Sequence, residues 1–358
     1  MNRRDFLYLS AMAAGLNLPR SAWGLSDPAP DDWRTYEVTT SVQIRPDQGP
    51  TRIWLPMPLP ERTSFQRTLS TSIDCKAGKA HRVQNANASM VCAQFPAGVA
   101  STITVTNRIA TRSWDVPLAQ PNRSITSSNQ AKAYLAPTQY VPTDGIVKAR
   151  ADSITKGMTS DVDKTRAVYE WVVENTHRDP KVRGCGVGDI RPMLETGDLG
   201  GKCADINALF VGLVKASGVP ARDVYGIRVA PSELSCKVLG AASDDITKAQ
   251  HCRAEVYLEG FGWVPMDPAD VRKVILEEPP GGLALNDIKV VETRKRLFGS
   301  WEGNWIAYNY AQDVSLPDSS GPALHFLMYP QAETADGRLD CLSPDTFTYK
   351  ITTRAITT

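Results

Sequence analysis

Apolar residues recur with two different periods along this chain, and the change of period separates strand-rich regions from a middle that contains helices. Period-two alternation, as at residues 36–44 and 102–109, with turns rich in Pro, Asn and Gly, predicts a β-rich N-terminal domain over residues 30–120. Toward the other end, aromatic residues mix with Thr-rich strand patterns, notably at 347–353. We therefore expect a β-rich C-terminal extension over residues 296–358 that forms an extra sheet on the core.

A period of three to four residues predicts two helices in the intervening region, residues 121–295. The first covers residues 161–175. The second is amphipathic, begins just after Lys202 and ends at Gly218, a residue typical of helix C-termini. Its apolar stripe is formed by Ile206, Leu209, Phe210, Leu213 and Val214. Helices and strands in one region predict an α+β core.

A β-hairpin follows the second helix. The run that begins at His251 alternates polar and apolar residues like a half-buried strand, and a shorter strand leads to Met266. A three-residue loop at Glu259–Phe261 pairs Met266 with Ala254 and leaves Asp267 diagonal to His251, within side-chain reach. A bulge would give the same facing, and the sequence does not separate the two. A two-residue turn would place Asp267 on the apolar side, so we prefer the longer loop.

Cys203 lies at the first turn of the second predicted helix. Unpaired N–H groups and the positive end of the helix dipole favour an anion there, which lowers the pKa of a thiol. Together with His251 as general base and Asp267 as its orienting acid, Cys203 forms the arrangement used in acyl transfer. Structural alternatives exist for two of them: a buried cysteine that packs as a hydrophobe, and a carboxylate that caps a turn before Pro268.

Four spaced stretches resemble the core of the transglutaminase-like superfamily, whose fold is related to that of the papain-like cysteine proteases. They are residues 201–205, 218–222, 251–257 and 262–268. The resemblance covers residues 160 to 275 and implies a papain-like fold, with Cys203 as nucleophile, His251 as general base and Asp267 as its partner. Many members carry an aromatic residue where this chain has Arg253, and a cation there favours an acidic or carboxylate-bearing substrate.

The N-terminal residues 1–24 have the features of a twin-arginine signal peptide. Asn2–Leu7 contains the paired arginines, residues 6–18 form an apolar run too short to span a bilayer, and 22–24 supply a small-x-small cleavage site. We expect export to a bacterial periplasm or to the outside of the cell, with an uncleaved anchor as the alternative. No membrane span is expected after signal removal.

Seven cysteines become informative in an exported chain, because six remain once Cys203 is set aside as a nucleophile. Six cysteines pair into three disulfides with open connectivity, and Cys75 and Cys92 lie close enough in sequence to bridge locally. The competing interpretation is a zinc site. Neither a Cys-x-x-Cys nor a His-x-x-x-His pair supports it, so we expect no metal and no cofactor.

Composition limits the partners more than it identifies them. The chain has 358 residues, 42% of them hydrophobic, and a net charge of +1 with scattered Lys and Arg, so we expect no nucleic-acid partner. We expect a protein or peptide substrate, with cell-envelope proteins among the candidates. Hydrolysis of amide or peptide bonds is the preferred activity. Amine transfer onto protein glutamine and a non-catalytic scaffold of the cell envelope are the alternatives.

Overall fold

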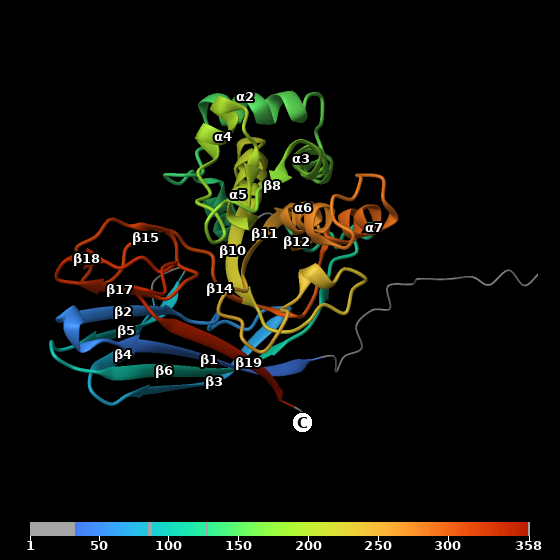
Figure 1. Ribbon diagram of the computed structural model, residues 1–358. Helices are drawn as coiled ribbons and strands as arrows, with labels where there is room; N and C mark the ends of the chain where they lie inside the picture. Colours follow the sequence, from blue (N-terminus) through green and yellow to red (C-terminus); the bar gives the residue numbers. More distant parts are fainter. Residues whose placement is uncertain (1–32, 85–87, 127, 357–358) are drawn as a thin grey trace, which may run out of the picture. The chain divides into compact units, whose positions relative to one another are not determined.

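Two antiparallel sheets face each other in the β-rich part of the protein. The computed structural model describes residues 33–84, 88–126 and 128–356, so the predicted signal peptide lies outside the described residues. One sheet has the strand order β19-β1-β6-β3 and the other β18-β17-β2-β5-β4 (Figure 1). Their bounds are β1 (Arg34–Ile44), β2 (Thr51–Pro56), β3 (Gln66–Cys75), β4 (Lys79–Gln84), β5 (Ser89–Phe95), β6 (Ser101–Thr111), β17 (Gln331–Thr334), β18 (Gly337–Arg338) and β19 (Tyr349–Ile356).

Apolar side chains from both sheets form a shared core. Val42 of β1 and Val105 of β6 pack in one cluster with Ile53 of β2 and Val91 of β5, and all four are buried. Burial alternates along most of β1, as a strand with one covered face requires. The predicted β-rich N-terminal region is confirmed.

The second part of the fold is a mixed core around the sheet β12-β11-β10-β14. Figure 1 shows helices gathered around these strands, with α5 next to β10. The strands are β10 (Ala221–Arg228), β11 (Gln250–Leu258), β12 (Gly262–Met266) and β14 (Trp305–Asn309). The helices are α2 (Gly145–Ile154), α3 (Asp161–Asn175), α4 (Ile190–Thr196), α5 (Cys203–Ala216), α6 (Pro268–Glu277) and α7 (Ile288–Arg296).

Short elements connect these parts. They are the helix α1 (Asn129–Lys132), the 3-10 turns η1 (Pro46–Gln48), η2 (Ala133–Leu135) and η3 (Lys237–Leu239), and the strands β7 (Trp114–Asp115), β8 (His177–Arg178), β9 (Gly200–Gly201), β13 (Ser300–Trp301), β15 (Gln312–Val314) and β16 (Leu324–Phe326). The predicted α+β class is confirmed. Within the described residues, no helix combines the length and apolar content needed to cross a bilayer.

Both predicted helices are present, but the second has a different environment from the one expected. The first is α3, with the predicted bounds. The second, α5, begins at Cys203 and is buried along its whole length, including the polar residues Asp205 and Asn207. The amphipathic interpretation was therefore wrong, because α5 packs against β10 and β11 as well as α2 and α3. Its polar residues have internal partners instead of solvent.

The C-terminal segment is β-rich, as predicted, but within its described residues only the short strands β15 and β16 form a sheet of their own. β19 pairs with β1, so that Thr353 lies opposite Val38, and β17 pairs with β2. β14 joins the core sheet beside β10. The expected extra sheet is therefore limited to two short strands, and the longer strands of the segment extend the N-terminal sheets and the core sheet, whose edges are free to pair with a late strand.

Candidate active site

Cys203 is the first residue of α5, and Lys202 alone separates it from the glycines of β9. A Cβ at Gly201 would lie 2.5 Å from the Cβ of Asp205, so this approach to the helix requires glycine. Asp205 accepts the backbone N–H of Lys202 at 2.9 Å and those of Val187 and Gly188 at 2.8 Å. The Asp205 carboxylate thereby fixes both the start of the helix and the loop that passes over it.

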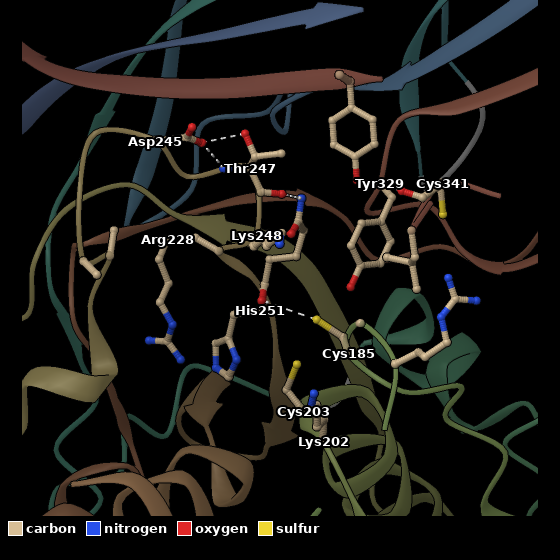
Figure 2. Close-up of a pocket in the computed structure, with 18 of the residues that line it drawn as sticks. Cys185, Lys202, Cys203, Arg228, Asp245, Thr247, Lys248, His251, Tyr329 and Cys341 are labelled. Carbon is tan, nitrogen blue, oxygen red and sulfur yellow. Dashed lines mark hydrogen bonds between the residues drawn. The ribbon is translucent and has the colours of Figure 1, made fainter. Parts of the chain in front are cut away.

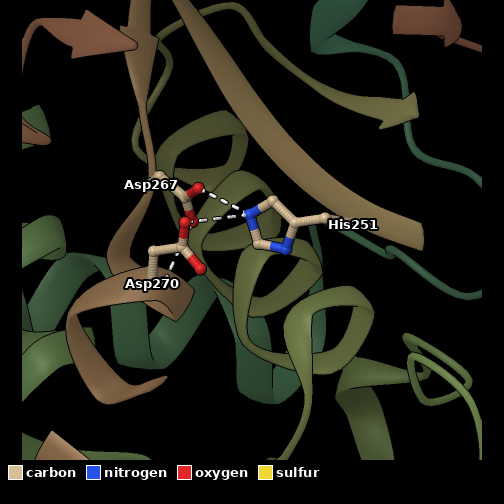
Figure 3. Close-up of side chains that lie close together, drawn as sticks. All are labelled: His251, Asp267 and Asp270. Carbon is tan, nitrogen blue, oxygen red and sulfur yellow. Dashed lines mark hydrogen bonds and ion pairs between the residues drawn. The ribbon is translucent and has the colours of Figure 1, made fainter. Parts of the chain in front are cut away.

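His251 and Asp267 meet through the predicted hairpin register. β11 pairs with β12 so that Ala254 lies opposite Met266, which confirms the three-residue loop at Glu259–Phe261. The Nε2 atom of His251 lies 2.7 Å from Oδ2 of Asp267, and both side chains are buried (Figure 3). Because Nε2 faces the carboxylate, Nδ1 is the ring nitrogen left for the thiol side of the site.

Asn207 holds Asp267 in place and was not predicted from the sequence. Its Nδ2 donates to the backbone carbonyl of Cys252 at 2.9 Å and to Oδ1 of Asp267 at 3.3 Å, and its Oδ1 accepts the N–H of Ala269 at 3.3 Å. This one buried amide therefore links α5 to β11 and to the start of α6. Its position four residues after Cys203 was the available signal, but in a helix interior that spacing also fits a surface amide.

A second carboxylate, Asp270, shares the histidine. Its Oδ2 lies 3.4 Å from Nε2 of His251, its Oδ1 accepts from Arg228 at 2.6 Å, and its N–H is capped by Asp267 at 3.1 Å (Figure 3). The sequence signal was the spacing of three residues between Asp267 and Asp270, which is typical of a helix N-terminus. The local pattern did not predict that Arg228, on β10, would neutralise this carboxylate.

The electrostatics favour a thiolate–imidazolium pair. The thiols of Cys185 and Cys252, and then the imidazole of His251, hold the pKa of Cys203 well below its usual range against the effect of burial. Burial and Arg228 lower the pKa of His251, but Asp270 and Asp267 outweigh them and raise it to about 9. The two shifts together favour the form in which the sulfur carries the negative charge and the ring the positive charge.

Arg253 does not have the environment that we expected. It is buried, its Nη1 donates to the carbonyl of Glu302 at 3.0 Å, and its guanidinium lies 4.7 Å from the ring centre of Trp305. Its Nε lies 3.8 Å from Asp267. Arg253 is therefore a cation behind the Asp267 carboxylate and does not line the cavity, so its expected contact with substrate is incorrect.

His251, Asp267 and Asp270 form a group whose potential ligand atoms lie within 4.8 Å of one another, the spacing that a metal ion needs. One oxygen of each carboxylate already accepts a hydrogen bond: Oδ1 of Asp267 from Asn207, and Oδ1 of Asp270 from Arg228. A further divalent cation here would meet the charges of the neighbouring arginines. The group suits a protonated imidazole better than a metal.

The cysteines do not pair as expected. All seven lie in the described part of the chain and all are free. Cys75 and Cys92 do not bridge locally, because Cys75 packs against the core shared by the two sheets and Cys92 lies in a different cluster with Trp54. Cys185 and Cys252 lie beside Cys203, so the thiols gather at the site instead of pairing across the fold.

A cavity of about 570 Å³ opens onto Cys203 and His251 (Figure 2). This volume is within the range of small-ligand and peptide-side-chain pockets. Among its described lining residues, Asp245 is the one carboxylate, and its partner is Lys350. The cations that line it are Arg178, Arg183, Lys202, Arg228, Lys248 and Lys273. Lys248 is exposed and has no ion-pair partner among the described residues.

Comparisons with known proteins bear on the family of this chain. A family model described as the transglutaminase-like superfamily matches residues 148–268, which include Cys203, His251 and Asp267. An uncharacterized protein of Haemophilus influenzae is 33% identical over 339 residues, covering 89% of this chain and 90% of that protein.

Solved structures also resemble the chain. A provisionally assigned cysteine protease of Cytophaga hutchinsonii aligns over 90% of this chain and 98% of its own, with 15% identity and a TM-score of 0.49. The periplasmic domain of TgpA from Pseudomonas aeruginosa aligns over 66% of this chain and 88% of its own, with 15% identity and a TM-score of 0.34.

Proposed function

Because this chain belongs to the transglutaminase-like superfamily, we propose that it is an exported cysteine enzyme that hydrolyses amide or peptide bonds. The observation that carries the proposal is the buried pair of His251 and Asp267 at 2.7 Å, next to a cysteine at the first residue of a helix. Nucleophile, base and orienting acid are the three parts that acyl transfer needs.

In the proposed reaction, the Cys203 thiolate attacks the carbonyl carbon. His251 then gives its proton to the leaving amine, which departs and leaves an acyl-enzyme. Water attacks the acyl carbon with the neutral imidazole as base, and the acid product leaves. Asp267 keeps Nε2 engaged throughout, so that Nδ1 handles the proton. The backbone N–H of Cys203, at the start of α5, is the donor that we propose for the oxyanion.

The positively charged lining of the cavity favours a substrate that carries a carboxylate. Several of its cations are already paired, as Arg228 is with Asp270 and Arg183 is with Asp340. Lys248 is unpaired within the described residues, and Lys202 donates to a backbone carbonyl at 2.6 Å, so both keep a net positive charge toward the cavity. We therefore propose protein or peptide substrates with a carboxylate near the scissile bond. Arg253 suggested this preference, but other residues supply the charge.

The pH dependence of Cys203 alkylation by iodoacetamide tests the proposed chemistry. The mature chain, kept reduced until the assay, should be labelled rapidly below neutral pH, with the site located by peptide mass mapping. His251→Ala should lose this rapid phase, while His81→Ala, at an exposed histidine of β4, should keep it. A wild-type Cys203 that reacts like an ordinary thiol would contradict the enzyme and favour a scaffold.

Labelling alone does not separate hydrolysis from amine transfer. Acidic and neutral peptide amides should therefore be incubated with and without a fluorescent primary amine. Hydrolysis predicts free acid product with no amine incorporated. Incorporated amine with little free acid would instead assign cross-linking as the activity.

A further inference from the structure

Two additional thiols surround the proposed nucleophile. Cys185 and Cys252 both lie close enough to the Cys203 sulfur to lower its pKa, and the Cys185 thiol donates to the carbonyl of Gln250 at 3.3 Å. Cys203 and Cys185 line the cavity and are 4% and 6% exposed, whereas Cys252 is 0% exposed and lies within β11. Hydrolysis by the proposed triad forms and breaks bonds at one sulfur, so the other two thiols take no part in its covalent steps.

Cys185 is held directly against the start of α5. Its backbone carbonyl accepts the N–H of Ala204 at 2.9 Å, which makes residues 185 and 203 neighbours in space. The loop is fixed there by Asp205, and a Cβ at Gly186 would lie 1.8 Å from that carboxylate. Figure 2 shows the sulfur atoms of Cys185 and Cys203 beside each other, near the ring of His251. Closely opposed backbones of this kind are what a disulfide needs.

We propose that Cys185 is the resolving thiol of a reversible oxidation site, forming a disulfide with Cys203 when the protein meets a peroxide. The consequence of this disulfide rests on the proposed function: it blocks the Cys203 nucleophile and protects it from further oxidation. The disulfide itself requires thiol chemistry and no turnover.

The reaction balances with hydrogen peroxide as the oxidant. The Cys203 thiolate attacks one peroxide oxygen, an S–O bond forms, the O–O bond breaks, and the departing hydroxide takes a proton to become water. The Cys185 sulfur then attacks the sulfenic sulfur, the S–S bond forms, and the S–O oxygen leaves as water with the Cys185 proton. Two thiols are oxidised and one peroxide is reduced. A dithiol such as dithiothreitol reduces this disulfide by exchange, which restores both cysteine thiols and oxidises the dithiol to its own cyclic disulfide.

The two neighbouring thiols are not equivalent candidates for the second step. Cys252 is closed off from the cavity, and its carbonyl is tied to Asn207 in the middle of a paired strand. Cys185 lies in a loop, and its sulfur reaches the cavity. Hydrogen bonding to Cys203 raises the pKa of Cys185, so Cys185 stays protonated while Cys203 reacts first.

Tryptic mapping under non-reducing conditions distinguishes the possible links. The full mature protein is reduced, freed of reductant, treated with hydrogen peroxide, and blocked with iodoacetamide. Trypsin places Cys203 in peptide 203–215, Cys185 in peptide 184–202 and Cys252 in peptide 249–253. We expect 203–215 joined to 184–202, and recovery of Cys203 labelling after dithiothreitol. A link to 249–253, or Cys203 recovered solely as sulfinic or sulfonic acid, overturns the assignment.

Two variants complete the test. Cys185→Ser should lose the link, so that peroxide converts Cys203 to products that dithiothreitol does not restore. Cys252→Ser is the matched control and should keep both the link and its reversal, and a melting curve for each variant checks that it folds. Equal recovery of Cys203 in both variants overturns the proposal. These readouts detect thiols and disulfides, not turnover. A chain that forms the link but cleaves no amide would therefore contradict the proposed hydrolysis and leave the disulfide proposal standing.

Discussion

Strands β11 and β1 alternate polar and apolar residues in the same way, yet their environments differ. In β1, alternate side chains face solvent and the sandwich core. In β11, both faces are covered, and His251, Arg253 and Glu255 are each 3% exposed or less. Alternation in a sequence therefore identifies a strand but does not show that its polar face is wet. Where the polar face is buried, each polar group on it needs a hydrogen-bonding or ionic partner. In β11, these groups and their partners form the candidate active site.

The largest effect is expected from removing the charge behind the histidine. Asp267→Asn keeps the size of the side chain but removes one of the two charges that raise the pKa of His251 to about 9. The amide also favours the wrong ring tautomer. We expect kcat/KM for an amide substrate to fall about 10³-fold, measured by product release. Activity within a factor of three of the unmodified protein would remove Asp267 from the mechanism.

A buried ion pair on the covered face should dominate stability. Arg222 and Glu255 lie directly opposite on β10 and β11, 2.6 Å apart, and the guanidinium stacks on Trp263 and Tyr310. Glu255→Ala leaves this cation without its partner in the interior. The free energy of unfolding in urea should fall by about 3 kcal/mol. A loss below 1 kcal/mol would mean that the aromatic rings alone satisfy Arg222.

The paired charges of the site also define a pH window. The proposed active form needs an ionised Cys203, whose pKa is lowered, and a protonated His251, whose pKa is raised to about 9. Hydrolysis should therefore hold through neutral pH and fall about tenfold per unit above pH 9. The contribution of His251 to the stability of the folded state also decreases as the pH rises. It is complete below the ordinary histidine pKa and is lost as pH rises through about 9.

A plateau that continued well beyond pH 9 in the unmodified protein would contradict the raised pKa. Asp267→Asn provides the internal comparison, because the loss of one of the two neighbouring carboxylates should move the alkaline limb to lower pH.

Features set by neighbouring residues could be predicted from the sequence, and features set by distant strands could not. The hairpin register followed from the match of Met266 to Ala254, and with it came the meeting of His251 and Asp267. The polar face of β11 is covered by Trp305 and Glu302, which lie some fifty residues later in the sequence and bond to His251 and Arg253. Local alternation contains no information about that cover, so Arg253 was expected at the cavity.

The same limit applies to the thiols and to the sandwich. Counting cysteines in a chain that was predicted to be exported favoured disulfides, but pairing depends on which strands become neighbours. β19 pairs with β1 although most of the chain lies between them in sequence, and the sequence of neither strand indicates the other as its partner. Periodicity also could not distinguish the buried α5 from a surface helix, because Asp205 and Asn207 read as solvent-facing until their partners are known.

A smaller effect is expected at the mouth of the cavity. Lys248 is exposed, lines the cavity and has no ion-pair partner in the described part of the chain. Lys248→Glu should raise KM about fivefold for a peptide with a carboxylate near the scissile bond, since an exposed charge contact contributes about 1 kcal/mol. KM for a neutral peptide should stay unchanged. Equal effects on both peptides would argue against charge recognition.

The smallest effect is expected from the exposed counterpart of the buried ion pair. Glu37 on β1 lies directly opposite Arg108 of β6 and Arg354 of β19, and it bonds to both at 2.9 and 2.6 Å. These guanidinium groups stand more than half exposed, so water replaces the carboxylate once it is gone. Glu37→Ala should lower the free energy of unfolding by about 0.5 kcal/mol, measured in the same urea series as Glu255→Ala. Both positions are carboxylates set across a strand from arginine, so a similar loss at the two would show that pairing geometry, and not burial of the polar face, decides the stability of these strands.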